Sequence, residues 1–291
     1  MIFVDGLEYP EAPVLMDDGS WLIAEMAMGS GRLTRISASG DQHQLLAETG
    51  RPNGLLLDSD GSVWVAESWQ PSLLRVSPKG DKQVVLEGCG DRPFLWPNDL
   101  VFGPDGAIYM TDSGIEVSRL IGENGLDEKV WQDDMSGCLY RIDPVSHQIE
   151  CIDDGYRFAN GLAFGPDGRL YVNEMVTGHI YRYDYNGKVV PHSRTLFASV
   201  IDPGGPSRVV GPDGMAFDGE GNLFVCVFGQ GHLAVVSPNG SIDRSIVTRG
   251  ACPTNVAFGP IGSRSIYVTE FQRGRVETYP VDHDGYAMPG N

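Results

Sequence analysis

The stretch PNGLLLDSDGSVWVAE, residues 52–67, joins two apolar runs through an Asp-Gly turn and ends in an acid. Variants of this stretch recur at residues 10–25, 97–112, 159–174, 212–226 and 253–270. The polar residues that open the copies stand at positions 11, 53, 98, 160, 213 and 255, with gaps of 42, 45, 62, 53 and 42 residues. Short β runs repeated at this period are typical of a β-propeller with one four-stranded blade per repeat. Six copies therefore predict six blades.

Further β runs complete each repeat and indicate how the ring closes. Third strands are expected at 33–36, 73–76, 139–142 and 180–183, and fourth strands at 44–46 and 83–86. The apolar residues 2–4 precede the first copy, whereas the last copy ends at 276–279 without a fourth strand. Pairing these two ends would close the ring, while a solenoid would leave two uncapped ends. We therefore expect an all-β fold, a single six-bladed propeller domain over residues 1–291, closed by the N-terminal strand.

The composition narrows the classes of partner. The chain holds 39 Asp and Glu against 21 Lys and Arg, a formal charge of −18. This balance argues against nucleic acid and against an anionic membrane surface, because both are bound through clustered basic side chains. No stretch is long and apolar enough to cross a bilayer and no signal peptide is evident, and five cysteines without CxxC spacing do not predict a disulfide framework. A cytoplasmic location is expected, and the oligomeric state is left open.

The residues that open the repeats are the candidates for chemistry. Taken singly, an Asn-Gly or Asp-Gly pair is best interpreted as a turn. Taken together, six equivalent side chains would encircle one mouth of the central channel: Glu11, Asn53, Asn98, Asn160, Asp213 and Asn255. The carboxylates of Glu11 and Asp213 would repel each other unless a divalent cation lay between them. Carboxylate and amide oxygens suit Ca²⁺, Mg²⁺ or Mn²⁺ better than a soft metal.

Four motifs at these positions resemble the regucalcin/gluconolactonase family, in the family's order and over essentially the whole chain. They are Glu11-Ala12-Pro13, Pro97-Asn98-Asp99, Asn160-Gly161-Leu162 and Pro212-Asp213-Gly214-Met215. The resemblance implies a six-bladed propeller that holds one divalent metal ion and hydrolyses lactones. It implies that Glu11, Asn160 and Asp213 are metal ligands and that Asn98 lies beside the metal or the substrate. In the related diisopropyl-fluorophosphatase propellers the residue matching Asn98 is a direct ligand. Calcium is the expected ion, with Mg²⁺, Mn²⁺, Zn²⁺ and Fe²⁺ as alternatives.

Two departures from the family pattern affect the expected substrate more than the metal. Animal sugar-lactonases carry an Arg that contacts the sugar two residues before the Asn of their Asn-Asp motif, where this chain has Trp96. Trp offers an apolar platform and one donor in place of a fixed charge, so Trp96 and Asn98 are expected to bind the substrate. The opening motif has Ala12 where Gly is commoner.

Metal-assisted hydrolysis of a sugar or small hydroxy-acid lactone is the expected reaction, with a small-molecule lactone as the partner. Asp213 is the candidate general base, and a purely ligating role for it is equally supported. Adjacent strand residues face opposite ways, so Asp99 is expected to be structural or to lie behind the ligands. Acids that end the second strands are expected to make structural hydrogen bonds: Glu25, Glu67, Asp112, Glu174 and Glu270.

Two alternatives stay open at this stage. A phosphotriesterase-like hydrolase could use the same cation, and a propeller without enzymatic activity could bind a ligand or protein at its rim. The long gaps mark insertions at 115–136 and 191–211, which are interpreted equally well as binding loops or as surface decoration.

Overall fold

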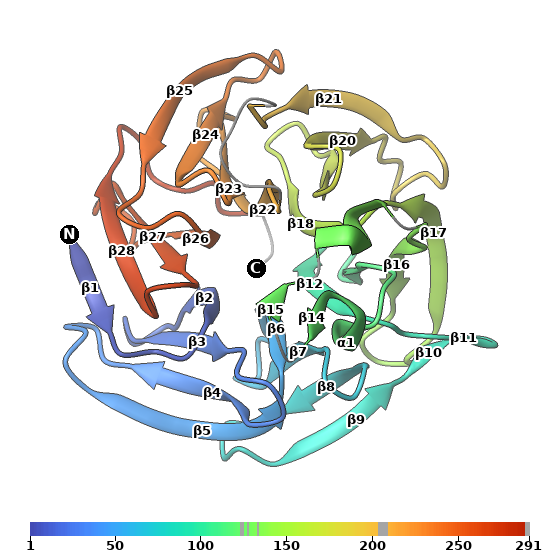
Figure 1. Cartoon of the computed structure of the whole chain (residues 1–291), viewed down its shortest axis with the longest axis horizontal. Coiled ribbons are helices and arrows are strands. Elements are labelled where there is room, and N and C mark those ends of the chain that lie inside the picture. Colours follow the sequence, from blue (N-terminus) through green and yellow to red (C-terminus); the bar gives the residue numbers. More distant parts are fainter. Residues whose placement is uncertain (123–124, 127, 133, 203–208, 289–291) are drawn as a thin grey trace.

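The structure is a computed structural model that describes residues 1–122, 125–126, 128–132, 134–202 and 209–288. Six four-stranded antiparallel sheets surround a central channel, as the repeats predict (Figure 1). The first three blades are β2 (Pro10–Leu15), β3 (Trp21–Glu25), β4 (Gly31–Ile36) and β5 (His43–Gly50); β6 (Pro52–Leu57), β7 (Val63–Glu67), β8 (Ser72–Val76) and β9 (Lys82–Leu86); and β12 (Pro97–Phe102), β13 (Ile108–Asp112), β16 (Gly137–Ile142) and β17 (Ile149–Tyr156). The next two are β18 (Ala159–Phe164), β19 (Leu170–Glu174), β20 (His179–Tyr183) and β21 (Thr195–Ser199); and β22 (Gly211–Phe217), β23 (Leu223–Phe228), β24 (His232–Val236) and β25 (Ile242–Val247).

The sixth blade is assembled from both ends of the chain. It consists of β26 (Pro253–Phe258), β27 (Ser265–Glu270), β28 (Arg275–Pro280) and the N-terminal strand β1 (Ile2–Asp5). In the pairing of β1 with β28, Ile2 lies opposite Glu277 and Val4 opposite Val276. The predicted closure is confirmed, and it pairs the outer edge of β28.

Each core lies between neighbouring blades, which explains why the second strands are largely apolar up to the acid that ends them. β3 and β7 are buried at every residue because both faces of each sheet pack against another blade. Leu22 and Leu33 of the first blade, for example, share a cluster with Leu55 and Val65 of the second. The outer strand β25 is exposed at nearly every position.

The acids that end the second strands hold the loops that lead into the innermost strands. Glu67 Oε1 accepts hydrogen bonds from the backbone N–H groups of Arg51 (2.7 Å) and Trp69 (2.8 Å). Asp112 accepts a hydrogen bond from the backbone N–H of Leu95. Three other blades repeat this pattern, with backbone N–H groups that donate to the acid: Glu8 donates to Glu25, Arg157 to Glu174, and Cys252 to Glu270. The predicted structural role of these acids is confirmed.

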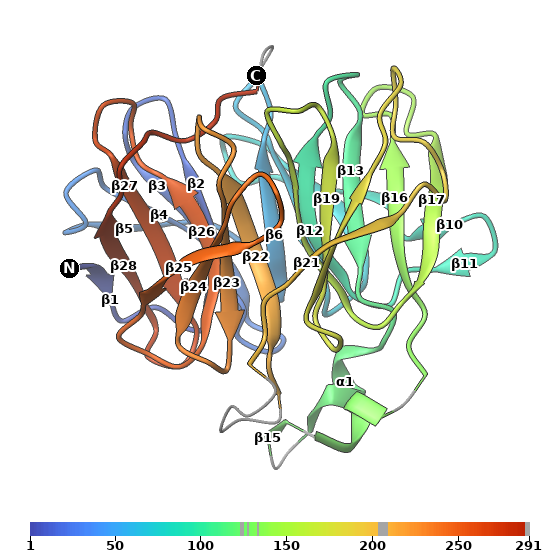
Figure 2. The same ribbon diagram turned by 90° about the horizontal axis from the view of Figure 1, so that it is seen from above.

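Small elements outside the blades distinguish the two ends of the channel. β10 (Gly88–Cys89) and β11 (Arg92–Pro93) form a hairpin at the rim, whereas α1 (Val117–Leu120), β14 (Ile121–Gly122), β15 (Gly125–Leu126) and the 3₁₀ turn η1 (Glu128–Gln132) form an excursion from the third blade. Figure 2 shows this excursion at one end of the propeller and the C-terminal segment at the other. No helix among the described residues is long and apolar enough to cross a membrane.

Candidate functional site

A backbone irregularity at the same place in all six innermost strands directs side chains into the channel. Pairing with the second strand shifts register between residues 11 and 14, 52 and 55, 97 and 100, 159 and 162, 212 and 215, and 253 and 256. A β-bulge bends its strand and re-aims the side chain at that point. Asn53-Gly54, Asn160-Gly161 and Asp213-Gly214 therefore lie inside strands β6, β18 and β22, and their interpretation as turns is wrong.

Glycine follows several of these residues because neighbouring strands approach closely there. A Cβ added to Gly161 would lie 2.8 Å from the Cα of Gly214, and one added to Gly214 would lie 2.7 Å from the Cα of Asn255. Both distances are too short for real side chains. The Asn-Gly pattern thus reflects close packing around the channel.

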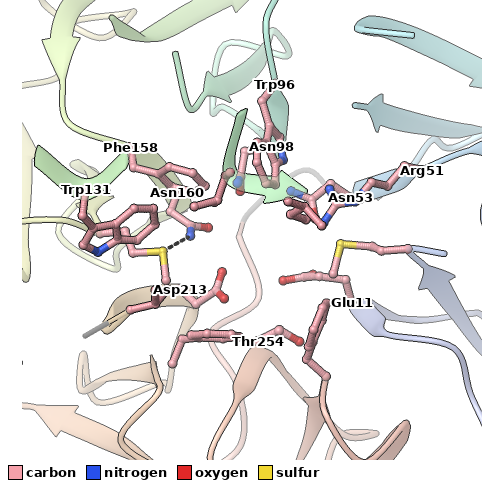
Figure 3. A pocket seen from close by; sticks show the side chains of 17 residues that line it. Glu11, Arg51, Asn53, Trp96, Asn98, Trp131, Phe158, Asn160, Asp213 and Thr254 are labelled. Carbon is pink, nitrogen blue, oxygen red and sulfur yellow. Dashed lines mark hydrogen bonds between the residues drawn. The ribbon is translucent and has the colours of Figure 1, made fainter. Parts of the chain in front are cut away.

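The ring residues meet in one pocket, at the end of the channel that carries the excursion (Figure 3). Its polar lining comes from all six innermost strands and the loop before β6: Glu11, Arg51, Asn53, Asn98, Asn160, Asp213 and Thr254. Trp96, the predicted substrate-binding residue, also lines it. Glu11, Asn98, Asn160 and Asp213, proposed from the sequence as metal ligands, are therefore brought together, and their roles stay a prediction.

The sixth member of the ring is Thr254, and its assignment to Asn255 is wrong. Pro253 lies opposite Glu270 just as Pro52 lies opposite Glu67, so the residue after each proline holds the equivalent position. Asn255 lies one residue further along, lines the cavity at the other end of the channel, and donates from Nδ2 to Glu11 Oε2 at 2.9 Å. Aligning the repeats on proline rather than on asparagine would have identified Thr254.

The two ring carboxyl groups are deeply buried and electrostatically unfavourable. Glu11 is 5% exposed and Asp213 is 8% exposed. Burial is the largest cause that raises the pKa of Glu11 well above its usual value, and the charges of Asp213 and Asp99 add to it. Burial and the charge of Asp99 likewise raise the pKa of Asp213. Two such groups are stable as anions only with a compensating positive charge nearby.

Two amide side chains of the ring have their nitrogens hydrogen-bonded within the protein. Asn98 donates from Nδ2 to Ser113 Oγ at 3.0 Å, and Asn160 donates from Nδ2 to Met175 Sδ at 3.6 Å. The amide nitrogens are thus held by protein acceptors, which leaves the carbonyl oxygens available to a ligand. Two carboxylates with amide oxygens form a donor set that fits a hard divalent cation. Within the described ranges, no three His, Cys, Asp or Glu side chains form a metal-binding group.

Asp99 lies behind the ring, in the cavity at the opposite end of the channel. Its Oδ1 accepts from the backbone N–H of Leu100 at 2.9 Å. Burial raises the pKa of Asp99 to about 6, although hydrogen bonds from the backbone N–H groups of Leu100 and Leu162 partly offset this increase. Its placement on the other face agrees with the alternation of side chains along a strand.

Arg51 is a pocket residue that the sequence reasoning missed. It stands two residues before Asn53, as Trp96 stands two residues before Asn98, and its guanidinium carbon lies 4.7 Å from the centre of the Trp96 ring. Burial lowers the pKa of Arg51 to about 10, partly offset by the charges of Glu67, Glu11 and Asp213, so the side chain stays charged at neutral pH. The signal that points to it is the repeat itself, because Arg51 holds in the second copy the position that Trp96 holds in the third.

Both insertions contribute to the wall of the pocket. Leu120, Ile121 and Trp131 come from the 115–136 excursion, and Val209 comes from the 191–211 insertion. Residues 123–124, 127, 133 and 203–208 of these insertions lie outside the described residues. The excursion packs on Trp96 and Phe158 in a separate apolar cluster above the ring.

Comparison with known proteins places this geometry in context. Residues 10–272 match the family model described as the SMP-30/Gluconolactonase/LRE-like region. A gluconolactonase of Zymomonas mobilis is 27% identical over 295 residues, 95% of this chain and 80% of the relative. Diisopropyl-fluorophosphatase of Loligo vulgaris is 26% identical over 296 residues, 94% of this chain and 90% of the relative.

Solved structures share the propeller. A gluconolactonase from Xanthomonas campestris superposes with a TM-score of 0.78 at 21% identity, covering 97% of this chain and 89% of that one. Regucalcin from Agrobacterium tumefaciens, described as a calcium-binding protein, gives 0.75 at 16% identity, covering 98% and 96%. Because the family model spans nearly the whole repeat region, the chain belongs to the SMP-30/gluconolactonase/LRE-like family.

Proposed function

We propose that the protein is a divalent-metal-dependent hydrolase that opens a small lactone. The observation that carries this proposal is the convergence in one pocket of two buried carboxyl groups and two amide side chains whose nitrogens are held by protein acceptors. Lactonases among the relatives support the reaction class, including the gluconolactonase of Zymomonas mobilis and a pentonolactonase of Haloferax volcanii, 26% identical over 90% of this chain.

Four residues would hold the ion: Glu11, Asn98, Asn160 and Asp213. The carboxylates would balance its charge and the amide oxygens would complete the protein's share of the coordination shell. Every candidate ligand is a hard oxygen, which suits Ca²⁺, Mg²⁺ or Mn²⁺. Calcium is the ion we expect among them, because a regucalcin of the same fold is described as a calcium-binding protein. The chemistry that such a cation supplies when bound is polarisation of the lactone carbonyl and stabilisation of the negative charge on its oxygen.

The protein's own groups would orient the substrate and move the proton. Asp213 lines the pocket, where its carboxylate could accept the proton of the attacking water as well as bind the ion. Asn98 and Trp96 lie side by side in the wall and would contact the lactone ring. The apolar cluster formed by the excursion, Trp96 and Phe158 would limit bulk water around the reacting carbonyl.

A phosphotriesterase-like activity is the second candidate. It is favoured by the similarity to diisopropyl-fluorophosphatase, which extends over 94% of this chain. A phosphoryl oxygen could take the place of the lactone carbonyl at the same ring.

The test is a substrate panel run on chelator-treated protein before and after a divalent cation is restored. The panel contains glucono-δ-lactone, γ-lactones with different substituents and diisopropyl fluorophosphate, with Ca²⁺, Mg²⁺, Mn²⁺ and Zn²⁺ each added alone. The proposal expects lactone hydrolysis that is lost with the chelator and regained with the ion. Hydrolysis that is indifferent to chelation would contradict it, and turnover of the phosphorus ester alone would favour the second candidate.

A further inference from the structure

Arg51 begins a continuous wall on one side of the pocket. The side chain is 3% exposed, and its guanidinium lies over the Trp96 ring at 4.7 Å. Trp96 contacts Phe158 edge to face, with ring centroids 5.2 Å apart. The ring centroids of Phe158 and Trp131 lie 5.4 Å apart. All four side chains line the pocket (Figure 3). The wall thus combines one fixed cation with three aromatic rings.

The guanidinium has donors to spare. Its one side-chain hydrogen bond to the described residues runs from Nη1 to Ser68 Oγ at 2.9 Å, whereas a guanidinium carries five N–H donors. Among the acids, Glu67 has the charge that raises the pKa of Arg51 most. Its Oε1 accepts hydrogen bonds from the backbone N–H groups of Arg51 and Trp69 rather than from the guanidinium. Stacking on Trp96 and the bond to Ser68 hold the planar group in place, so little freedom would be lost on binding an anion.

The rest of the wall suits an apolar substrate. Apart from the six ring residues and Arg51, the described residues that line the pocket are hydrophobic, for example Met26, Met175 and Phe228. The indole N–H groups of Trp96 and Trp131, which are buried without a hydrogen-bond partner among the described residues, are the further donors in this lining. A polyhydroxylated lactone would place several hydroxyl groups against this wall, where these two indole groups could partner only two of them, and burying a hydroxyl without a partner costs free energy. A lactone with few hydroxyl groups avoids this cost.

Resting on the lactonase function proposed above, we propose that Arg51 binds a carboxylate of the substrate, which is a compact lactone with an apolar frame rather than a sugar lactone. A guanidinium matches a carboxylate in shape and can donate two parallel hydrogen bonds to it. With the lactone carbonyl at the ring and the carboxylate at Arg51, the molecule would be fixed at two points. The aromatic wall would contact the frame between them.

A different role for Arg51 is to neutralise Glu11 and Asp213, whose charges also act on it. The two roles predict different consequences of removing the cation. Loss of a neutralising charge would change the affinity for the metal ion, whereas loss of a substrate-binding charge would change the selection among lactones.

The first experiment measures binding without turnover. The probes are 3-oxocyclopentane-1-carboxylate, which has no ester bond to hydrolyse, and its neutral carboxamide, titrated into calcium-loaded protein by calorimetry. Wild-type protein should bind the carboxylate at least tenfold more tightly than the amide. Arg51→Met should abolish this preference, Arg51→Lys should retain part of it, and the exposed control Arg169→Met should retain all of it. Equal affinity of wild-type protein for the two probes would overturn the proposal.

The second experiment compares two lactones that differ at one substituent. They are 5-oxotetrahydrofuran-2-carboxylate and γ-valerolactone, in which a methyl group replaces the carboxylate. Arg51→Met should raise KM for the carboxylate at least tenfold more than KM for the methyl compound. Equal effects on both, together with a changed calcium affinity, would assign Arg51 the neutralising role and overturn the proposal. Absence of hydrolysis in every form would contradict the lactonase function instead, while the binding experiment would still test Arg51.

Discussion

Replacing Asp213 by Asn removes one of two buried charges while nearly preserving the shape of the side chain. In metal-free protein, burial and neighbouring charges already raise the pKa values of Glu11 and Asp213, so the charged ring opposes folding. Asp213→Asn should therefore raise the unfolding temperature of the metal-free protein. The same substitution removes a proposed ligand, so it should also reduce the stabilisation by calcium.

The size of the calcium effect follows from linkage and chain length. An ion at about 100 times its Kd stabilises the folded state by about 2.7 kcal/mol. For 291 residues the entropy of unfolding is about 0.6 kcal/mol per degree, from roughly 2.1 cal/mol/K per residue, so the expected rise in Tm is about 4 °C. A hundredfold loss of affinity leaves about 0.4 kcal/mol at the same calcium concentration, less than about 1 °C.

The assay is thermal unfolding of wild-type protein, Asp213→Asn and Glu11→Gln, each in chelator and in excess calcium. Asp243→Asn, on the exposed outer strand β25, is the matched control and should behave as wild type in both buffers. The reasoning is refuted if Asp213→Asn keeps the full calcium shift, or if it is less stable than wild type in chelator.

The remaining predictions concern pH, the other ring residues and the packing of the channel. The raised pKa values of Glu11 and Asp213 let the folded state hold protons that the unfolded state releases from about pH 4 upward, so metal-free protein should lose stability as pH rises above that point, by at most roughly 1.4 kcal/mol per pH unit for each proton. Calcium should flatten the curve of Tm against pH. A Tm that rises with pH in chelator would contradict this prediction. Asp213→Asn should abolish lactone turnover in steady-state assays, whereas Asn53→Ala should reduce kcat far less, and equal losses would mean that different ring residues hold the ion. Gly161→Ala should lower the free energy of unfolding by about 1–3 kcal/mol, because the added Cβ would lie 2.8 Å from the Cα of Gly214 on the neighbouring strand. Gly168→Ala has no atom within 4 Å of its added Cβ, so it should lose only the free energy that corresponds to the strain of its positive φ. Similar Tm values for the two variants would contradict this packing.

The sequence was sufficient for the blades because each copy carries its own turn and apolar runs. The pairing of residues 2–4 with the last blade followed from the missing fourth strand and is confirmed. The bulges were not foreseen, because a bulge depends on the pairing of two strands and leaves no distinct residue pattern. Taken singly, Asn160-Gly161 is therefore best interpreted as a turn, although it lies inside β18.

The gathering of Glu11, Asn98, Asn160 and Asp213 in one pocket could be anticipated, because equivalent positions of a closed ring must face the same channel. The wall of the pocket could not. Arg51 and Trp96 come from different blades, and their stacking depends on side-chain packing that repeats alone do not specify. Nor does the chain order reveal that described residues of the 115–136 excursion pack on Trp96 and Phe158.

The most direct test of the central claim is a crystal structure of protein loaded with Mn²⁺, which replaces calcium at oxygen sites and scatters anomalously. The proposed metal ligands predict one anomalous peak in the pocket, within coordination distance of the carboxylates of both Glu11 and Asp213. This peak should be absent in Asp213→Asn. A map with no peak between these two side chains, or with its strongest peak elsewhere, would contradict the account.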